Sequence, residues 1–259
     1  MLEIKDGGFS VGSKWLLQNI SYKFLPGNCY MICGPNGAGK STLMKLLSLV
    51  ALPDTGEVIY NNTKIDYRKK EVYAKYRAVL SQQVDISFPL EVAEVVMMGR
   101  YPHFKINPTK KDVEICNEVM NLQNLQSFRN RNFLTLSGGE KQRVQFARVL
   151  AQIWQMPDEG ARILLLDEPI SSLDVKYQFD FLHHVKQFLN ESTIVIAVLH
   201  DLNLALNYAD EILLLKGGKL FAGGKPADVL SPSNISEVFQ LNFNLYSPGN
   251  VKLLWPSNY

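Results

Sequence analysis

Apolar residues occur with two different spacings along this chain. Short apolar runs have the length of buried strands, and the segments after them carry apolar residues at three- and four-residue spacing, as helices do. The strand-like runs are Cys29–Cys33, Arg77–Leu80, Ile163–Leu166 and Ile194–Leu199. Strands that alternate with helices in this way are typical of a mostly parallel sheet covered by helices. The pattern therefore predicts an α/β fold.

Three further segments predict antiparallel strands. Residues 2–25 alternate loosely around three glycines, which is typical of strands and turns. Glu57–Tyr60 follows a turn that contains proline and glycine, and it has the pattern of a strand. Later in the chain, Ile212–Leu215 and Lys219–Phe221 flank a pair of glycines and predict a hairpin. We expect these strands to add an antiparallel β subdomain to the parallel core.

A long helical block begins near Leu90 and continues to about Gln152. Its apolar residues recur at helical spacing; they include Val92, Val95, Val96, Val113, Val119 and Met120. We interpret residues 85–152, approximately, as a helical subdomain inserted into the α/β core. A length of 259 residues fits one large domain with such a subdomain, so we expect residues 1–259 to form a single domain.

The composition narrows the class of protein. With 46% hydrophobic and 20% charged residues the chain has an ordinary globular composition, and a net charge of +2 gives no reason to expect nucleic acid as a partner. The longest apolar runs are far too short to cross a bilayer, and no secretion leader precedes the first expected strand. Three cysteines without metal-ligand spacing are interpreted as core residues. We therefore expect a protein of the reducing cytosol that reaches any membrane through partners.

The most specific chemistry lies in one glycine-rich stretch. It reads Gly34-Pro35-Asn36-Gly37-Ala38-Gly39-Lys40-Ser41-Thr42 and fits the phosphate-loop pattern G-x-x-x-x-G-K-[ST] without a mismatch. Glycines let backbone N–H groups approach phosphate oxygens, at the positive end of the helix expected over Leu43–Leu47. Lys40 is expected to reach the β- and γ-phosphates, and the Ser41 hydroxyl to complete the coordination of Mg²⁺. The competing interpretation is a chance glycine turn, which the flanking strand and helix disfavour.

Two carboxylates follow the apolar run Ile163–Leu166. A buried strand that ends in Asp167-Glu168 delivers both side chains to the ligand-binding edge of a parallel sheet. Asp167 is expected to hold Mg²⁺, directly or through water, and Glu168 to polarise the water that attacks the γ-phosphate. A solvated strand end is the alternative for an isolated pair of this kind.

Leu136-Ser137-Gly138-Gly139-Glu140 opens an amphipathic helix, with Ser137 and Glu140 in the spacing of a capping box. Taken alone, this is a capped helix. Between a phosphate loop and an Asp-Glu strand, however, these five residues resemble the signature of the ATP-binding-cassette (ABC) ATPases. The resemblance implies that Ser137, Gly138 and Gly139 close on the ATP held by the opposite subunit of a dimer.

Further marks of that family appear in order along the chain. Gln82 stands where the family has its Q-loop glutamine, which binds the metal and links the nucleotide site to the transport partner. Ser172-Leu173-Asp174 resembles the D-loop, and His200 resembles the switch histidine that contacts the γ-phosphate. The resemblance covers nearly the whole chain and implies a P-loop NTPase fold that binds ATP and Mg²⁺. It implies Glu168, His200 and Gln82 as catalytic residues, and Ser41, Gln82 and Asp167 as metal ligands. The other histidines, His103, His183 and His184, are interpreted as structural.

Two positions depart from the family pattern. Val11 stands where an aromatic residue often stacks on adenine, and Phe9, two residues earlier on the same expected strand, is the candidate substitute. Ile170 replaces the usual threonine after Asp-Glu-Pro, at a position that is not catalytic.

The segment from Phe88 to His103 narrows the subfamily. Its Gly-Arg-x-Pro-His run resembles the importers of iron chelates, heme and cobalamin, and its Phe-Pro start resembles the hemin-import ATPases within that group. Leu150–Trp154 and Val198–Leu204 agree with this resemblance. Generic packing residues of the wider group are the alternative interpretation. The expected function is therefore the ATPase subunit of a hemin importer, with a ferric-siderophore or cobalamin importer as the alternative.

The resemblance also implies partners. Composite ATP sites need two copies of the chain, so we expect a homodimer docked on separate transmembrane permease subunits, at the cytoplasmic face of the inner membrane. A periplasmic or surface heme-binding protein would be an indirect partner, and nucleic acid is not expected. DNA-repair relatives would need a coiled-coil or zinc insert and translation relatives a second cassette, and neither feature is in this sequence. A binding module without catalysis is disfavoured because Glu168 and His200 are both present.

Overall fold

The computed structural model describes residues 1–81, 86–157, 160–171, 173–246 and 252–257. The chain divides into two compact units: residues 1–67 with 189–259, and residues 68–188. Parallel strands and helices occur in both units, as the α/β pattern predicts. Whether residues 85–152 form a separate subdomain of a single domain stays a prediction.

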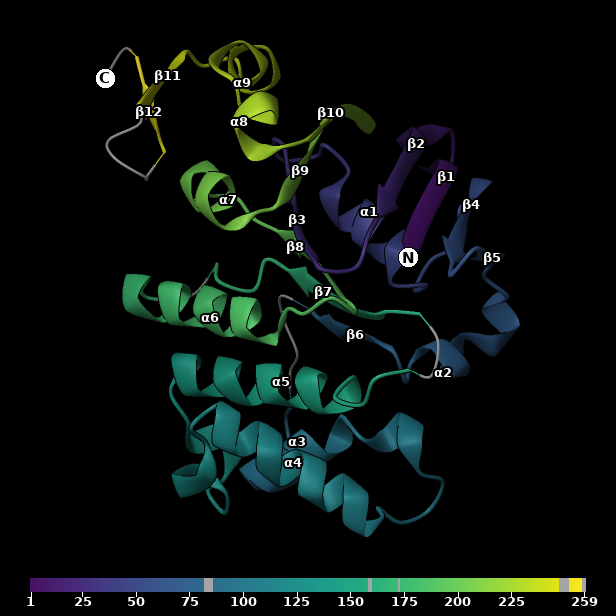
Figure 1. Ribbon diagram of the computed structural model, residues 1–259, viewed down its shortest axis with the longest axis vertical. Coiled ribbons are helices and arrows are strands. Elements are labelled where there is room, and N and C mark those ends of the chain that lie inside the picture. The colour runs from purple at the N-terminus through teal and green to yellow at the C-terminus, as the bar shows by residue number, and fades with distance from the viewer. Residues whose placement is uncertain (82–85, 158–159, 172, 247–251, 258–259) are drawn as a thin grey trace. The chain divides into compact units, whose positions relative to one another are not determined.

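The first unit contains an antiparallel sheet of order β2-β1-β4-β5 and a group of mostly parallel strands of order β10-β9-β3-β8 (Figure 1). Its elements are β1 (Leu2–Val11), β2 (Lys14–Phe24), β3 (Asn28–Cys33), α1 (Lys40–Leu47), β4 (Thr55–Tyr60), β5 (Thr63–Lys64), β8 (Thr193–Val198), α7 (Leu202–Tyr208), β9 (Glu211–Lys216), β10 (Lys219–Gly224), α8 (Pro226–Val229), α9 (Pro232–Phe239), β11 (Phe243–Tyr246) and β12 (Leu253–Pro256). The antiparallel N-terminal strands and the β9–β10 hairpin are confirmed.

The second unit contains the parallel pair β6–β7 and most of the helices. Its elements are α2 (Lys70–Tyr73), β6 (Arg77–Leu80), α3 (Val92–Met98), α4 (Lys110–Leu122), α5 (Gly138–Gln152), β7 (Arg162–Asp167) and α6 (Val175–Phe188), with short 3₁₀ helices η1 (Tyr67–Lys69, which starts at the boundary of the units), η2 (Tyr101–His103), η3 (Gln126–Phe128) and η4 (Phe133–Thr135). Among the described residues, none of these helices or of those in the first unit is long and apolar enough to span a membrane.

The strands β3, β7 and β8 are buried along nearly their full length, which is why the sequence reads as continuous apolar runs there. All six residues of β8 are buried, as are five of the six in β3 and in β7. Parallel strands with both faces covered lose the polar alternation of a half-exposed strand. The helical face of α4 differs from the expected one in one respect: Val113 is 37% exposed, and the buried face runs instead through Ile115, Cys116, Val119 and Met120.

The Gly-Arg-x-Pro-His run joins α3 to the C-terminal end of α5. A Cβ atom on Gly99 would lie 2.0 Å from the Arg148 carbonyl oxygen, so only glycine lets the two backbones approach this closely. Arg100 is buried, and its guanidinium donates to the Asp112 carboxylate at 2.9 Å and to the Ala151 carbonyl at 2.7 Å. The His103 Nε2 lies 2.7 Å from the Gln152 carbonyl oxygen.

The same end of α5 is attached to the strand pair. The Gln152 side-chain amide donates to the Ala74 carbonyl at 2.7 Å and to the Arg77 carbonyl, at the start of β6, at 2.9 Å. The Gly-Arg-x-Pro-His run therefore has a packing role, because it fixes the C-terminal end of α5. Ser137 lies at the opposite end of that helix. Packing of this kind carries no information about a transported cargo.

The buried ion pair gives a stability prediction. Arg100→Met should lower the free energy of unfolding by about 3–5 kcal/mol, because it leaves the Asp112 carboxylate buried without its partner cation. Burial raises the pKa of that carboxyl, but hydrogen bonds from Thr109 and Arg100 outweigh burial and hold the pKa below its usual range. A carboxyl of this kind stabilises the fold above its unfolded-state pKa, near 4, and loses that contribution as the pH falls.

Urea unfolding of wild type and of Arg100→Met, at pH 7 and at lower pH values, measures the free energy of unfolding of each protein. The difference between wild type and Arg100→Met should be largest at pH 7 and should shrink below about pH 4. Lys105→Met is the control, because it removes an exposed cation a few residues beyond Arg100. It should change the free energy of unfolding by less than about 0.5 kcal/mol. Equal stability of wild type and Arg100→Met at pH 7 would contradict the assigned role of the ion pair.

Candidate active site

The glycine-rich loop connects β3 to α1, so the strand–loop–helix context expected from the sequence is confirmed. Three of its residues have positive φ: Gly34 at 149°, Gly37 at 78° and Gly39, the N-cap of α1, at 102°. Side chains would be strained there, and a Cβ on Gly34 would also lie 2.4 Å from the Leu215 carbonyl oxygen. Around Gly37, by contrast, no atom of the described residues would lie within 4 Å of an added Cβ, so the tip of the loop is open. A turn of this kind presents backbone N–H groups to an anion.

Lys40 folds back over this loop. Its Nζ donates to the carbonyl oxygens of Gly34 at 2.8 Å and Pro35 at 3.0 Å, and only 6% of the residue is exposed. Ser41 follows on the exposed side of the helix start. The loop thus combines a cation, a hydroxyl and helix N–H groups, which is the donor set that a nucleoside triphosphate with a hard metal ion requires.

Cys33, immediately before the loop, is excluded as a nucleophile. Burial raises the pKa of its thiol to about 12, so the sulfur stays protonated at neutral pH. Cys29, Cys33 and Cys116 are all buried and unoxidised, which confirms their interpretation as core residues.

His200 belongs to the same unit as the loop. It follows β8, which pairs in parallel with β3, and the Leu199 N–H donates to the Ile32 carbonyl at 3.4 Å. Its side chain is exposed at the carboxyl edge from which the loop also starts. The next residue, Asp201, has a structural role, since its carboxylate caps α7 through the N–H groups of Asn203 and Leu204.

The second unit holds the two adjacent carboxylates. Asp167 is the last residue of β7, and Glu168 follows with a left-handed backbone, at φ 51°. Few residues other than glycine adopt this conformation, and it costs of the order of 1 kcal/mol. The Glu168 carbonyl accepts hydrogen bonds from the Ser171 hydroxyl at 3.1 Å and the Ser171 N–H at 3.4 Å, which hold the turn. Strained backbone of this kind gathers at functional sites.

The strand before the Q-loop glutamine leads toward the same edge. β6 pairs in parallel with β7, with Leu80 opposite Leu166, so Ser81 leaves the sheet at the edge where Asp167 lies. Gln82 itself lies outside the described residues, as does Ser172 of the expected D-loop.

The capping box at the start of α5 is confirmed. The Ser137 N–H donates to the Glu140 carboxylate at 2.7 Å, and the Glu140 N–H donates to the Ser137 hydroxyl at 3.4 Å. Hydrogen bonds from the backbone and the side chain of Ser137 to the carboxylate lower the pKa of Glu140. Ser137 and Gly138 are exposed, and no atom in the described part of the chain would contact a Cβ on Gly138, so the turn is accessible to a partner.

Two glutamines that sequence reasoning missed hold the segment after Glu168. The Gln142 side-chain amide, on α5, donates to the Pro169 carbonyl at 2.7 Å. That of Gln178, on α6, donates to the carbonyls of Leu173 at 2.9 Å and Ile170 at 3.3 Å. We call the turn at Ser137–Gly139 the signature turn and the segment that starts at Glu168 the carboxylate turn. Within this unit, a hydrogen bond from α5, the helix that the signature turn opens, therefore holds the carboxylate turn. In the sequence, the feature that could have pointed to Gln142 is its position about one helical turn beyond the capping box.

Trp15 is a third residue that the sequence did not single out. β2 passes against the phosphate loop, since a Cβ on Gly39 would lie 2.9 Å from the Leu16 carbonyl oxygen. Trp15, one residue earlier, pairs with Ser10 of β1 and is 42% exposed. The sequence search for an aromatic partner of adenine considered β1 alone, because register across a hairpin is not visible in the sequence.

Comparison with known proteins agrees with this geometry. The family model for ABC transporters matches residues 17–171. The hemin import ATP-binding protein HmuV of Gloeobacter violaceus is 44% identical over 242 residues, which cover 93% of this chain and 88% of that protein. HmuV of Escherichia coli O157:H7 is 38% identical over 252 residues, 96% of each chain.

Solved structures give the same assignment. A metal-chelate type ABC transporter in an inward-facing conformation matches with a TM-score of 0.83 and 24% identity, over 98% of this chain and 96% of that one, and shows the fold. The ATP-binding cassette MJ0796, as a dimer bound to ADP and Pi after hydrolysis, matches with a TM-score of 0.73 and 26% identity, over 87% of this chain and 99% of that one. This chain belongs to the ABC transporter family, as an ATP-binding domain that hydrolyses ATP.

Proposed function

We propose that this chain energises the import of hemin, as the ATPase subunit of an ABC importer. The observation that carries the proposal is the identity of 38–44% over nearly the whole chain to relatives named hemin import ATP-binding proteins. A ferric-siderophore or cobalamin importer is the competing function, because the residues that resemble the iron-chelate group have packing roles in this fold. Cargo preference would belong to the permease and to a periplasmic or surface binding protein.

Binding of ATP would use the loop residues 34–42. Backbone N–H groups at the open tip would hold phosphate oxygens, and Lys40 would exchange its two carbonyl partners for the β- and γ-phosphates. Ser41, Gln82 and Asp167 offer a hydroxyl, an amide and a carboxylate, which are oxygen ligands suited to Mg²⁺. When bound, Mg²⁺ would neutralise charge on the phosphate oxygens.

Hydrolysis would use the carboxylate turn and the histidine. Glu168 would accept a proton from the attacking water, and the bonds that fix its backbone would limit the reorganisation that this step requires. His200 and Gln82 would position the γ-phosphate and the water. Most of the rate enhancement would come from charge arranged in advance around a loose phosphoryl transition state.

The active form would be a homodimer. The exposed Ser137 and Gly138 of one chain, with the half-buried Gly139, would bind the nucleotide held by the loop of the other. MJ0796 is dimeric in two solved structures, which supports this arrangement. Closing and reopening of the dimer would then drive a membrane partner.

That partner would be a separate permease at the cytoplasmic face of the inner membrane. Large apolar side chains are exposed before and after α3 along the chain: Phe88 is 53%, Tyr101 58% and Ile106 87% exposed. Exposed apolar residues gathered in one segment are typical of interaction sites. We propose this segment, residues 88–106, as the permease contact.

Glu168→Gln should bind ATP but trap the dimer. The amide keeps the shape of the carboxylate and removes the base, so turnover should fall by about 10²–10⁴-fold. Gel filtration with Mg·ATP should then show a dimer of the variant, whereas the double variant Lys40→Ala/Glu168→Gln should stay monomeric. A Glu168→Gln protein that hydrolyses ATP at the wild-type rate, or that elutes only as monomer, would contradict the scheme.

Trp15→Ala should weaken ATP binding more than Phe9→Ala does. We propose that the exposed indole stacks on adenine, and base–aromatic stacking contributes about 1–3 kcal/mol, or about 5- to 150-fold in Kd. Fluorescent-ATP titration of both variants measures this. If Phe9→Ala alone weakens binding, the first expectation from the sequence holds and Trp15 has no such role.

Growth on defined iron sources tests the cargo. Cells that lack this chain should fail to grow on hemin and should grow normally on a ferric siderophore. The wild-type gene should restore growth on hemin, and the Glu168→Gln copy should not. Failure on the siderophore alone would replace the hemin assignment while leaving the ATPase function intact.

A further inference from the structure

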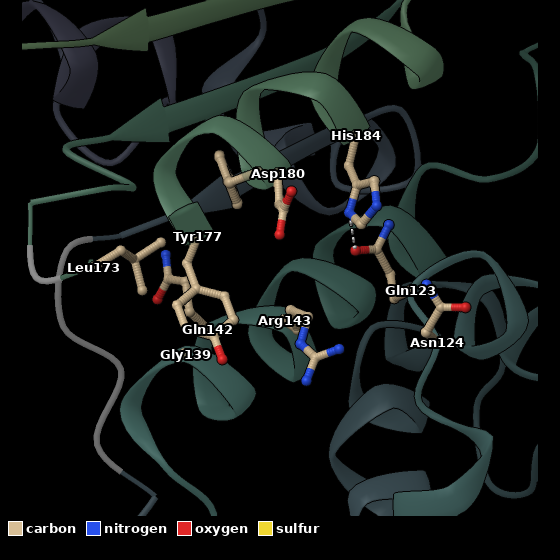
Figure 2. Close-up of a pocket in the computed structure, with 10 residues that line it drawn as sticks. Gln123, Asn124, Gly139, Gln142, Arg143, Leu173, Tyr177, Asp180 and His184 are labelled. Atoms are coloured by element: carbon tan, nitrogen blue, oxygen red, sulfur yellow. Dashed lines mark hydrogen bonds between the residues drawn. The ribbon is translucent and has the colours of Figure 1, made fainter. Parts of the chain in front are cut away.

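A cavity of about 230 Å³ opens within the second unit, between α5 and α6, beside the end of α4 (Figure 2). One water needs only about 10–15 Å³ of such space, so a ligand of several heavy atoms fits. Gly139 of the signature turn and Leu173 line one part of the cavity, and Gln123 and Asn124 line another. None of the catalytic roles proposed above uses this space.

Opposite charges face the cavity from different helices. Asp180 extends from α6 and Arg143 from α5, and both side chains line the cavity (Figure 2). No ion pair joins these two residues in the described part of the chain. The Arg143 guanidinium lies instead 5.8 Å from the centre of the Phe128 ring. The cavity therefore has one cationic and one anionic wall that do not neutralise each other directly.

Two residues of the lining carry buried hydrogen-bond donors without acceptors among the described residues. Gln123 is fully buried; its Oε1 accepts from the His184 Nδ1 at 3.1 Å, and its Nε2 makes no hydrogen bond to any described protein atom. The Arg143 Nε is likewise buried without an acceptor from that part of the chain. Neither atom presents surface to a water-sized molecule, so these two donors do not reach a ligand in the cavity.

The remaining lining is neutral or aromatic. Burial, together with the nearby His183 and Arg143, lowers the pKa of His184, which leaves that imidazole uncharged at neutral pH. Tyr177 and Phe181 are the aromatic residues of the lining. Arg143 and Asp180 are then the charged groups of the lining, and their charges sum to zero. A phosphate or other dianion would meet the Asp180 carboxylate, so a ligand with one anionic and one cationic group matches the walls better.

We propose that this cavity binds a small zwitterion of the amino-acid type. Its carboxylate would accept from the Arg143 guanidinium, and its ammonium group would donate to Asp180. Its side chain would pack against Tyr177. Because Gly139 lines the same cavity, the bound molecule would lie next to the turn that is proposed to bind the nucleotide of the other chain.

Calorimetric titration of the full chain tests the proposal. The protein is held in saturating Mg·ADP, so that its nucleotide site is filled, and each of the twenty standard amino acids is added in turn. At least one should bind saturably at millimolar concentration or below. For L-alanine and its single-charge analogues, propionate and ethylamine, the zwitterion should bind at least tenfold more tightly than either analogue. Absence of saturable binding by every amino acid, or equal binding of propionate and alanine, would overturn the proposal.

Two substitutions test the assigned contacts. Asp180→Asn removes the charge from an exposed side chain and should weaken binding of the best amino acid at least tenfold. Arg143→Gln should do the same from the carboxylate side. Glu114→Gln, which neutralises an exposed carboxylate on α4 outside the cavity, is the matched control and should bind as wild type. Circular dichroism and urea unfolding check that each variant is folded. Wild-type affinity in a folded Asp180→Asn protein would overturn the proposal.

Discussion

Hydrogen bonds fix α5 at both of its ends, and the functional segments of the second unit depend on this helix. At its C-terminal end, the Gln152 amide donates to the chain on either side of the turn into β6, and the Arg100 guanidinium donates to the Ala151 carbonyl. At its N-terminal end, the capping box shapes the signature turn, and Gln142 holds the Pro169 carbonyl. Because α5 is held at both ends, its position determines where Ser137 and the carboxylate turn lie.

In the first unit, the backbone path of the phosphate loop depends on glycine. Gly34 and Gly39 combine positive φ with close approach of neighbouring backbone, from Leu215 and Leu16. The loop is therefore shaped by steric exclusion, and its amides are arranged before any phosphate arrives. Preorganised donors of this kind need little rearrangement when the ligand binds. No other residue type can occupy these two positions without backbone strain, so the loop requires glycine at both.

The sequence predicted the buried core well and the surface poorly, for physical reasons. Continuous apolar runs located β3, β6, β7 and β8 to within a residue at each end, since burial of both faces leaves a strong signal. β1 and β2 proved to be long strands with several shifts in register, which an alternating pattern does not reveal. The C-terminal pair β11–β12 carries exposed residues on one face and gave no signal. Trp15, Gln142 and Gln178 act across elements, so their partners depend on packing rather than on local spacing.

The left-handed backbone of Glu168 has a consequence for how mutants at this position are interpreted. Residues branched at Cβ fit this conformation badly, so an inactive valine or isoleucine variant would reflect a distorted turn as much as a missing carboxylate. Aspartate or asparagine, which tolerate the conformation best among residues with a side chain, change the reach of the group by one methylene. Only the isosteric amide separates loss of charge from loss of shape. Kinetic comparisons among replacements at residue 168 therefore measure backbone preference and proton transfer together, in proportions that differ with each side chain.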